Sequence, residues 1–348
     1  MTVAVTAAGR ARRILLAHVE TWRPYTLWYI GLVGLGGAAL VTGPHQPWRL
    51  FAAWAAPTAG WLGAHYLGDY FDRVLDAGSK PHRPIPSGRL RPATALACGC
   101  VWIAVLAVLA VAGGWGTTVA AVLGVCGIVG YSRWFKRHGM AGNLVRGALG
   151  AVALLYGVAV AGHWPSTATL VTLLVLAAAF WLHDTMSNLV GTLRDIDGDR
   201  LGGYATLPVR RGTPLAVWTV LALYAAMTVA ALAAGLLAAR GDRLHYLVTM
   251  TVVVALGVTA LAPLVAHRAA MPAAAALRAH AVLVVERVVL ASAVVGLGLG
   301  VGWQLALVIP LALLTWSTQS AMRTRHELGS ARTVPAVAVL TSPVEDVS

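Results

Sequence analysis

The sequence predicts an all-α protein, a polytopic transmembrane helical bundle of nine or ten helices. Apolar residues make up 58% of the chain and charged residues only 11%, whereas soluble domains carry about a quarter charged residues. The mean hydropathy is +0.74. Apolar stretches of about 20 residues recur along the whole chain, and each is long enough to cross ~30 Å of hydrocarbon as a helix.

These apolar stretches place the expected transmembrane helices along the chain. We expect them at roughly 26–42, 50–69, 93–113, 116–135, 143–162, 168–192, 214–238, 246–266, 281–301 and 303–322. Only Gly300–Gly302 separates the last two, which leaves the count at nine or ten. Around them we expect a basic cytoplasmic N-terminal segment at 1–20, the transmembrane domain at 21–322 and a disordered, polar cytoplasmic tail at 323–348.

The distribution of basic residues predicts the orientation. With ten helices, 23 of the 26 Lys and Arg residues lie on the side shared by both termini or at its helix ends, and the exceptions are Arg49, Arg240 and Arg243. Since cytoplasmic loops carry the excess of Lys and Arg, this side should be cytoplasmic, as in a bacterial-type plasma membrane. A nine-helix count would place Arg323 and Arg325 outside, which favours ten.

Composition also excludes two other classes. The net charge is +13, and basic chains often bind nucleic acid, but here no basic segment belongs to a soluble domain, so we expect no nucleic-acid partner. The three cysteines, Cys98, Cys100 and Cys126, lie inside apolar stretches. Their odd number and their position indicate packing rather than disulfides or a metal site.

The first polar cluster spans Gly68 to Pro92. Asp69, Asp72 and Asp76 are spaced i, i+3 and i+7, so a helix places them on one face. A proline-rich basic loop follows them, with Lys80, His82, Arg83, Arg89 and Arg91. Carboxylates that can hold a hard divalent cation, next to cations that can hold an anion, predict a metal–diphosphate site.

A second acidic cluster follows the sixth expected helix, and by the same count it lies on the same side. Asp195 and Asp199 share one helical face, and Asp197 points elsewhere. Six of the 13 acidic residues belong to the two clusters. Mg²⁺ prefers one or two carboxylates with water and phosphate oxygens, which suits two facing helix ends. The alternative is a loop at the membrane surface whose acids are paired with neighbouring Arg.

Three further polar residues lie deeper in the expected helices. His65 is one turn before the first cluster, and Asp184 is three turns before the second, about 16 Å into the bilayer. Because a mid-membrane carboxylate costs roughly 2.5–3.5 kcal/mol, Asp184 should face a cavity or a partner. We expect it to bind the acceptor of a reaction or remove its proton, with Asn188 on about the same face of the helix, and we expect a separate functional role for His65. The alternatives are a buried pair with His183, and a His65 that only caps a backbone carbonyl.

Other polar and aromatic residues receive a weaker interpretation. We expect Glu286 and Arg287, at the start of a late helix, to reach for the interface or pair with each other, and we assign them no role. Aromatic side chains either line a cavity or anchor and pack the helices, and the candidates are Trp61, Tyr66, Tyr70, Tyr156 and Trp181.

The two acidic clusters resemble the motifs of the UbiA superfamily of intramembrane prenyltransferases. The family's first motif, N-D-x-x-D-x-x-x-D followed by K-P-x-R-P-I-P-S-G, stands here as GDYFDRVLD and KPHRPIPSG. Its second motif, D-x-x-x-D followed by G-K-x-T-L-P, stands here as Asp195–Asp199 and GYATLP.

The segments around the clusters carry the same resemblance. The family's Tyr-Ser stretch with a basic pair matches YSRWFKR at 131–137, and its glycine–asparagine helix start matches GNLVRG at 142–147. An early Arg-Pro matches Arg23–Pro24. The resemblance covers nearly the whole chain, from about 20 to 320, and implies a helical bundle around a central cavity.

The resemblance also implies the roles of the site residues. Two Mg²⁺ ions that bridge a prenyl diphosphate would be held by Asp72 and Asp76 with Asp195 and Asp199, and Asp69 belongs to the same motif. Lys136, with Arg83 or Arg137, would hold the diphosphate. The candidate donor-binding residues are Lys80, Arg83, Tyr131, Lys136, Arg137 and Asn143, and the candidate catalytic residues are Asp72, Asp184, His65 and Asn188.

The expected activity is Mg²⁺-dependent transfer of a prenyl group from an allylic diphosphate to a lipophilic acceptor, for which we expect an aromatic ring, with membrane lipid as the surroundings. The alternative is a membrane terpene cyclase that acts on the diphosphate alone. Gly68 and Tyr204 replace the Asn and Lys of the family motifs, and these departures are the reason to keep the alternative beside the first hypothesis. A transporter or scaffold would explain the helices but not the paired aspartate motifs. The oligomeric state stays open.

Overall fold

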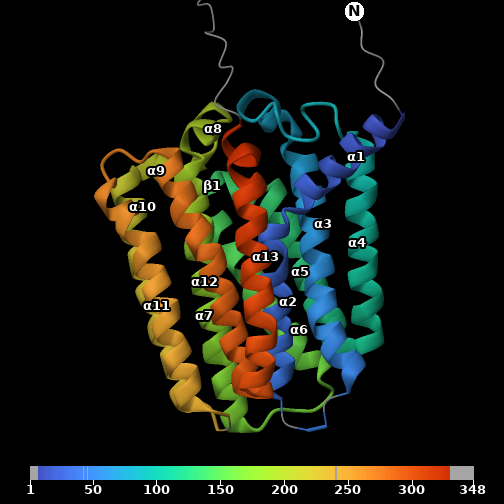
Figure 1. The fold of residues 1–348 in the computed structure, drawn as a ribbon, viewed down its shortest axis with the longest axis vertical. Coiled ribbons are helices and arrows are strands. Elements are labelled where there is room, and N and C mark those ends of the chain that lie inside the picture. The colour runs from blue at the N-terminus through green and yellow to red at the C-terminus, as the bar shows by residue number, and fades with distance from the viewer. Residues whose placement is uncertain (1–6, 42, 45, 240, 330–348) are drawn as a thin grey trace, which may run out of the picture.

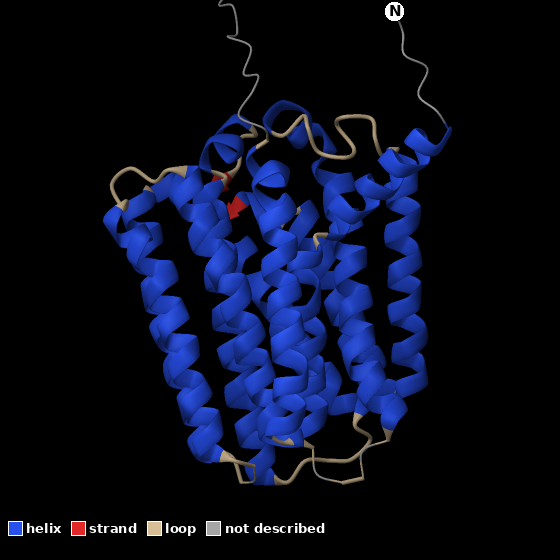
Figure 2. Cartoon of the chain, in the orientation of Figure 1, coloured by secondary structure: helices blue, strands red, loops and turns tan. Residues whose placement is uncertain are grey.

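The computed structural model describes residues 7–41, 43–44, 46–239 and 241–329. The described chain forms a bundle of long helices that run side by side, with short elements gathered at one end (Figure 1). Figure 2 shows that helices account for almost all of it, apart from the connecting loops and one small pair of strands. The all-α prediction is confirmed.

The long helices follow the predicted order. They are α1 Ala7–Trp22, α2 Pro24–Leu40, α3 Pro47–Ser79, α4 Pro92–Gly113, α5 Trp115–Arg133, α6 Ala141–Val160, α7 Thr167–Arg194, α10 Thr213–Leu237, α11 Arg243–Ala266, α12 Ala273–Leu299 and α13 Val301–Leu328. The short elements are η1 Phe135–Arg137, α8 Ile196–Leu201, α9 Leu207–Arg211, β1 His138–Gly139 and β2 Ala205–Thr206.

Each of the ten predicted spans corresponds to one helix, from α2 to α7 and from α10 to α13. Within the described residues, eight helices are long and apolar enough to cross a membrane, namely α4 to α7 and α10 to α13. Helix α2 has 17 residues, and α3 carries the first acidic cluster in its last turns. Gly300, at φ 93°, ends α12 and starts α13. A residue other than glycine rarely adopts this conformation, so the two helices are separate.

Helix starts follow local sequence signals. Proline stands in the first turn of α2, α3, α4 and α10, where its missing N–H has no intrahelical partner to lose. The Ser166 side chain accepts a hydrogen bond from the Thr169 N–H and caps α7, and Asp242 does the same for α11 through the His245 N–H.

Glycine allows the helices of the core to pack closely. A Cβ at Gly157 of α6 would collide with the carbonyl oxygen of Gly34 of α2, and one at Gly37 of α2 would collide with that of Leu154 of α6. In lipid, where apolar burial does not drive helix association, such contacts hold helices together by close packing. These contacts bring the backbones of α2 and α6 close together inside the bundle.

Two predicted boundaries are wrong. Helix α12 begins at Ala273 rather than near 281, because its first turns tolerate Arg278, which is exposed, and His280, which faces a cavity. Helix α13 continues to Leu328, so Arg323–Leu328 is helical and not part of a disordered tail. Residues 330–348 of that predicted tail, and the first six residues of the N-terminal segment, lie outside the described residues.

Candidate active site

A cavity of about 420 Å³ lies between the two acidic clusters, and we call it the central cavity. Side chains from α2, α3, α5, α6, α7, α8, α12 and α13 line it. It brings together most of the residues that the sequence predicted: His65, Asp69, Asp72, Asp76, Lys80, Arg83, Tyr131, Lys136, Asp184, Asn188, Asp195 and Asp199. The loop 80–91, η1 and α8 lie around one end of the cavity, which we call the polar end.

Helix α3 presents the first cluster to the cavity. Asp69 and Asp76 are buried, whereas Val74 on the opposite face is 78% exposed. The helix ends at Ser79, just before Pro81, and the Lys80 N–H bonds back to the Asp76 carbonyl oxygen. The chain then turns back over the acids, which the contacts of Arg83 with Asp76 and of Lys80 with Asp195 show.

The second cluster lies across the cavity at the end of α7. Asp195 ends that helix, and the Asp199 N–H donates to the Asp195 carbonyl oxygen at 2.8 Å as α8 begins. The Asp197 side chain is 94% exposed and lies 3.5 Å from Arg200, although Asp197 is also among the residues that line the cavity. The strand pair β1–β2, with His138 opposite Ala205, ties the η1 segment to the chain that follows α8. This pairing brings Lys136 beside the acids.

Most of these carboxylates have a cation as partner. Lys136 Nζ donates to Asp72 Oδ2 at 2.6 Å. Arg83 Nη1 lies 2.9 Å from Asp76 Oδ2. Although burial opposes its charged form, Asp72 and the neighbouring Tyr131 hold the pKa of Lys136 above its ordinary value. In each pair, a basic side chain that could bind an anion contacts a carboxylate that could bind a metal ion.

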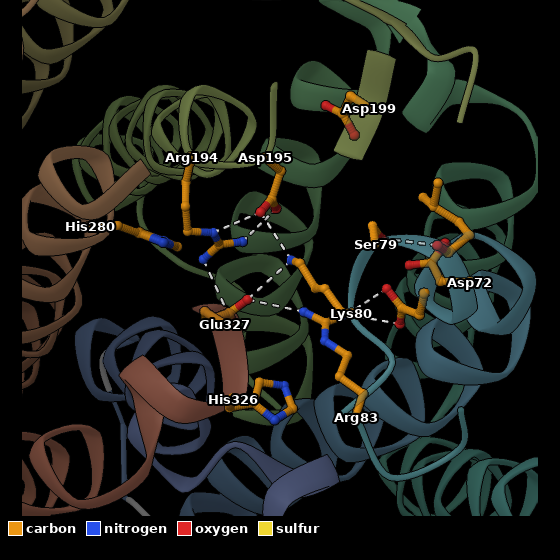
Figure 3. A network of polar contacts seen from close by, with 12 residues as sticks. Asp72, Ser79, Lys80, Arg83, Arg194, Asp195, Asp199, His280, His326 and Glu327 are labelled. Atoms are coloured by element: carbon orange, nitrogen blue, oxygen red, sulfur yellow. Dashed lines mark hydrogen bonds and ion pairs between the residues drawn. The ribbon is translucent and has the colours of Figure 1, made fainter. Parts of the chain in front are cut away.

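Asp195 has two such partners. Lys80 Nζ donates to Asp195 Oδ1 at 2.9 Å, and Arg194 Nη2 donates to Oδ2 at 2.6 Å (Figure 3). Burial raises the pKa of Asp195, but Arg194 and Lys80 outweigh this, and its pKa lies below the ordinary value. The acids are paired with basic neighbours, as the alternative of an ion-paired surface loop predicted. However, these pairs line the central cavity.

Asp199 differs from the other carboxylates. It is buried, and among the described residues its carboxylate accepts a hydrogen bond only from Thr206 Oγ1, at 3.2 Å. Burial, with the charge of Asp195, raises the pKa of Asp199 to about 6. A cation bound beside it would stabilise its carboxylate form. This donor chemistry fits a divalent metal, although within the described residues no three His, Cys, Asp or Glu side chains are grouped closely enough to enclose one.

Glu327, in the last turn of α13, joins the cations of both sides (Figure 3). Its carboxylate lies 3.0 Å from Arg83 Nη2, 3.3 Å from Lys80 Nζ and 3.3 Å from Arg194 Nη1. The sequence interpretation missed this residue because it placed Glu327 in the disordered tail. After Met322 the chain reads RTRHEL, with Leu328 as its one apolar residue, so hydropathy gave no signal that the helix continues to Glu327.

Asp69 and His65 lie against the break between α1 and α2. Arg23, at φ 46°, ends this break and forms an ion pair with Asp69. Its Nε also donates to His326 Nε2 at 3.1 Å. His65 Nδ1 lies 2.9 Å from the Trp22 carbonyl oxygen, which is the alternative considered for it, and the same ring lines the central cavity.

Asp184 lines the cavity from α7 and is buried, and neither of its oxygens has a hydrogen-bond partner in the described part of the chain. His183 Nδ1 is 3.6 Å from Asp184 Oδ1, but His183 Nε2 is 2.6 Å from Glu286 Oε2. The expected pairing of Glu286 with Arg287 is therefore wrong. Arg287 instead lies 4.7 Å from the Tyr29 ring centroid and lines the cavity.

Two predicted residues lie outside the cavity lining. The Asn143 side chain is buried, and with its amide oriented to suit its neighbours it bonds to Asn188 Nδ2 at 3.0 Å. It therefore supports Asn188, whose Oδ1 accepts from the Tyr131 hydroxyl at 3.4 Å. Arg137 lies 5.4 Å from the ring centroid of Tyr204, and Lys136 lies 5.7 Å from it. Where the family has a lysine, this chain offers an aromatic face to two cations.

A second, apolar pocket of about 50 Å³ lies beside the central cavity. It shares Trp61, Ile128 and Leu149 with the cavity and extends between α3, α4, α5 and α6 to Leu106 and Tyr156. Of the aromatic candidates, Trp61 and Tyr156 therefore line a cavity. Trp181 instead packs against α6, where its Nε1 donates to the Leu144 carbonyl oxygen at 3.0 Å.

The sequence is similar to a known protein family and to several of its members. Residues 29–283 match the model of the UbiA prenyltransferase family. The digeranylgeranylglyceryl phosphate synthase of Ignicoccus hospitalis is 32% identical over 233 residues, which cover 66% of this chain and 75% of the relative. That of Natronomonas pharaonis is 33% identical over 192 residues, 55% of this chain and 67% of the relative.

Solved structures share the fold. A structure of digeranylgeranylglyceryl phosphate synthase superimposes with a TM-score of 0.61 at 19% identity and covers 83% of this chain and 99% of its own. A UbiA homologue from Archaeoglobus fulgidus bound to DMAPP and Mg²⁺ gives 0.55 at 14% identity and covers 76% and 98%. At these identities the likeness concerns the arrangement of the helices.

Proposed function

The chain belongs to the UbiA prenyltransferase family, and on this premise we propose that it transfers a prenyl group from an allylic prenyl diphosphate to a lipophilic acceptor, with release of diphosphate. One observation carries the proposal: the two acidic clusters line opposite sides of one cavity, and a set of cations lines the same cavity. The binding of DMAPP and Mg²⁺ by a protein of the same fold supports this use of the cavity.

The carboxylates of the two clusters are the proposed metal ligands. Asp72 and Asp76 of α3, with Asp195 and Asp199 across the cavity, would hold Mg²⁺, and Asp69, which is paired with Arg23, would support them. Bound Mg²⁺ would neutralise charge on the diphosphate as it leaves. Asp199 supports this assignment, because in the described part of the chain its buried carboxylate has the Thr206 hydroxyl as partner but no ion pair, and a bound cation would stabilise its charge.

The basic residues of the polar end are the proposed diphosphate ligands. Lys80, Arg83 and Lys136 now contact Asp195, Asp76 and Asp72. When a metal takes over these carboxylates, the same cations can donate to diphosphate oxygens instead. Charge-assisted hydrogen bonds from fixed cations stabilise the charge that grows on the leaving group, which lowers the barrier to breaking the allylic C–O bond.

The deeper parts of the cavity suit the two organic groups. The apolar pocket of about 50 Å³ next to Trp61 and Leu149 has room for only part of a prenyl chain, and its apolar walls would keep water from that part. Asp184, whose oxygens lack partners, would accept the proton of the acceptor or position its nucleophile. Asn188, held by Tyr131 and Asn143, would orient groups between Asp184 and the metals.

The relatives bear on the class of acceptor, and the basic residues bear on the orientation. The relatives are named for a glyceryl phosphate product, which favours a lipid acceptor over the aromatic ring expected from the sequence. Gly68 lines the cavity with open space where the family has an amide, and this observation keeps cyclisation as the second candidate. The excess of basic residues at the polar end favours a cytoplasmic location for it.

Diphosphate release by the purified protein tests the proposal. The protein in detergent is incubated with C10, C15 and C20 prenyl diphosphates, with or without Mg²⁺ and candidate acceptors. We expect Mg²⁺-dependent release that requires an acceptor and falls at least about 100-fold in Asp72→Asn and Asp195→Asn. Release that the variants leave unchanged would contradict the assigned site, and a cyclic hydrocarbon without acceptor would favour cyclisation.

A further inference from the structure

The ring of Tyr204, which stands where the family motif has a lysine, lies beside two cations. Its centroid is 5.7 Å from Lys136 Nζ and 5.4 Å from the guanidinium carbon of Arg137. Both distances are within the ~6 Å over which a ring face attracts a cation. Lys136 lines the central cavity, whereas Tyr204 is not among the described residues that line it. The ring can therefore act on the cavity through Lys136.

Backbone contacts fix the chain on both sides of this ring. Gly203, at φ 70°, turns the chain after α8, and the Tyr204 N–H then donates to the Asp199 carbonyl oxygen at 2.8 Å. Two residues further on, Thr206 pairs with Gly139 in the two-stranded sheet, and its hydroxyl donates to Asp199 Oδ2. The ring is therefore held between the second acidic cluster and the η1 segment.

Lys136 needs a partner that remains when the site is occupied. In the described part of the chain it forms one ion pair, with Asp72 at 2.6 Å. Asp72 is also a proposed Mg²⁺ ligand, and a carboxylate that binds the metal attracts the ammonium group less strongly, because the metal neutralises its charge. A lysine side chain is flexible, so it would lose its orientation at the moment when the diphosphate requires it. The ring of Tyr204 is a contact that metal binding does not remove.

An aromatic face suits this position better than another charged side chain. It carries no net charge, so it does not compete with diphosphate for the ammonium group as a second carboxylate would. The ammonium group has several N–H donors, and those that point away from the ring stay free for phosphate oxygens. The lysine of the family motif would instead place a third positive charge beside Lys136 and Arg137, and like charges at this range repel.

We propose that Tyr204 is a positioning residue that keeps Lys136 directed at the diphosphate after Asp72 has bound Mg²⁺. The inference rests on the proposed function, because it assigns a role within the site of that reaction. Tyr204 touches neither the metal nor the diphosphate, and its effect on diphosphate binding passes through the Lys136 ammonium group. The departure from the family motif at this position thereby has a function of its own.

Binding of inorganic diphosphate tests this role apart from catalysis. The full-length protein in detergent, with saturating Mg²⁺, is titrated with inorganic diphosphate by calorimetry, and thermal unfolding of each variant is recorded. We expect Tyr204→Leu to weaken diphosphate binding about three- to tenfold, the range for loss of a partly desolvated cation–π contact. Tyr204→Phe keeps the ring face and should stay within about twofold of wild type.

A double-mutant cycle assigns the loss to Lys136. In the Lys136→Met background, Tyr204→Leu should weaken diphosphate binding less than about 1.5-fold, because the cation that the ring holds is absent. A merely structural role of the ring would cause the same loss in both backgrounds. Tyr70→Leu is the matched control, since Tyr70 contacts Arg73 at 4.4 Å and neither residue belongs to the described cavity lining. It should leave the affinity unchanged.

Each other result contradicts one of the two proposals. Unchanged affinity in Tyr204→Leu, an equal loss in Tyr204→Phe, or equal losses with and without Lys136 would overturn the positioning role of Tyr204. Diphosphate binding that depends on the ring through Lys136, together with no diphosphate release from any prenyl donor, would retain that role and remove the proposed transferase activity.

Discussion

Glu327 Oε2 lies 3.0 Å from Arg83 Nη2, so the end of the last helix touches the basic loop that follows α3 (Figure 3). The same carboxylate reaches Lys80 and Arg194. The Glu327 carboxylate therefore contacts two of the cations, Lys80 and Arg83, that are proposed to bind diphosphate. A bound diphosphate must compete with it.

Replacing Glu327 should change the stability of the fold and the affinity for diphosphate in opposite directions. In Glu327→Gln we expect inorganic diphosphate to bind about three- to tenfold more tightly, because its competitor is gone, and the free energy of unfolding to fall by roughly 1–3 kcal/mol. Calorimetry and thermal unfolding in detergent measure the two effects. Glu20→Gln, which removes the pair with Arg89 outside the cavity, is the control for affinity. Weaker diphosphate binding in Glu327→Gln would show that Glu327 supports the site instead.

The two acids of α8 provide a matched test of the metal site. Asp199 is buried with Thr206 as its partner, whereas the Asp197 side chain is 94% exposed. We expect Asp199→Asn to lower Mg²⁺-dependent diphosphate release at least about 100-fold and to require more Mg²⁺, since a carboxylate oxygen is lost. Asp197→Asn should stay within about twofold. Similar losses in both variants would mean that the effect comes from folding of α8.

Gly68 can be tested by restoring the family residue. A Cβ at this position meets nothing within 4 Å, so the cavity has room for a side chain. Gly68→Ala should stabilise the protein by about 0.5–1 kcal/mol, because glycine inside a helix is unfavourable. Gly68→Asn should also fold and should tighten donor binding through its amide, measured by calorimetry with Mg²⁺. Equal donor affinity in the Asn and Ala variants would show that the amide has no role here.

The orientation can be measured with single cysteines at exposed positions of opposite ends. Ala270 lies between α11 and α12 at the polar end, and His163 lies between α6 and α7 at the other (Figure 1). If the polar end is cytoplasmic, a membrane-impermeant maleimide should label His163→Cys in intact cells and Ala270→Cys only after permeabilisation. The native cysteines are replaced first. The reverse pattern would invert the orientation.

The sequence was sufficient for the helices and for both acidic clusters, because each depends on a local pattern. Apolar length gave the ten spans, and the spacing of Asp69, Asp72 and Asp76 gave the face of α3. The structure brings that face together with Asp195 and Asp199 in one cavity, as the shared side of the two clusters predicted.

The residues that the sequence interpretation missed lie near helix boundaries that it misplaced. A hydropathy pattern ends a helix at the first charges, even where those charges face a cavity. Arg287 was therefore placed at the start of its helix instead of its middle, and Glu327 in a tail instead of the last turn of α13. The partners of a charge, such as His183 for Glu286, depend on tertiary packing and have no local signal.

The ratio of diphosphate released to prenylated acceptor formed tests the central claim most directly. Both products are measured in one reaction of the purified protein with Mg²⁺, a prenyl diphosphate and an acceptor. Transfer predicts equal amounts of the two products, and neither when the acceptor is omitted. Diphosphate release that is unaffected by omitting the acceptor, accompanied by a cyclic hydrocarbon or a free prenyl alcohol, would contradict the proposal that this cavity joins a prenyl donor to an acceptor.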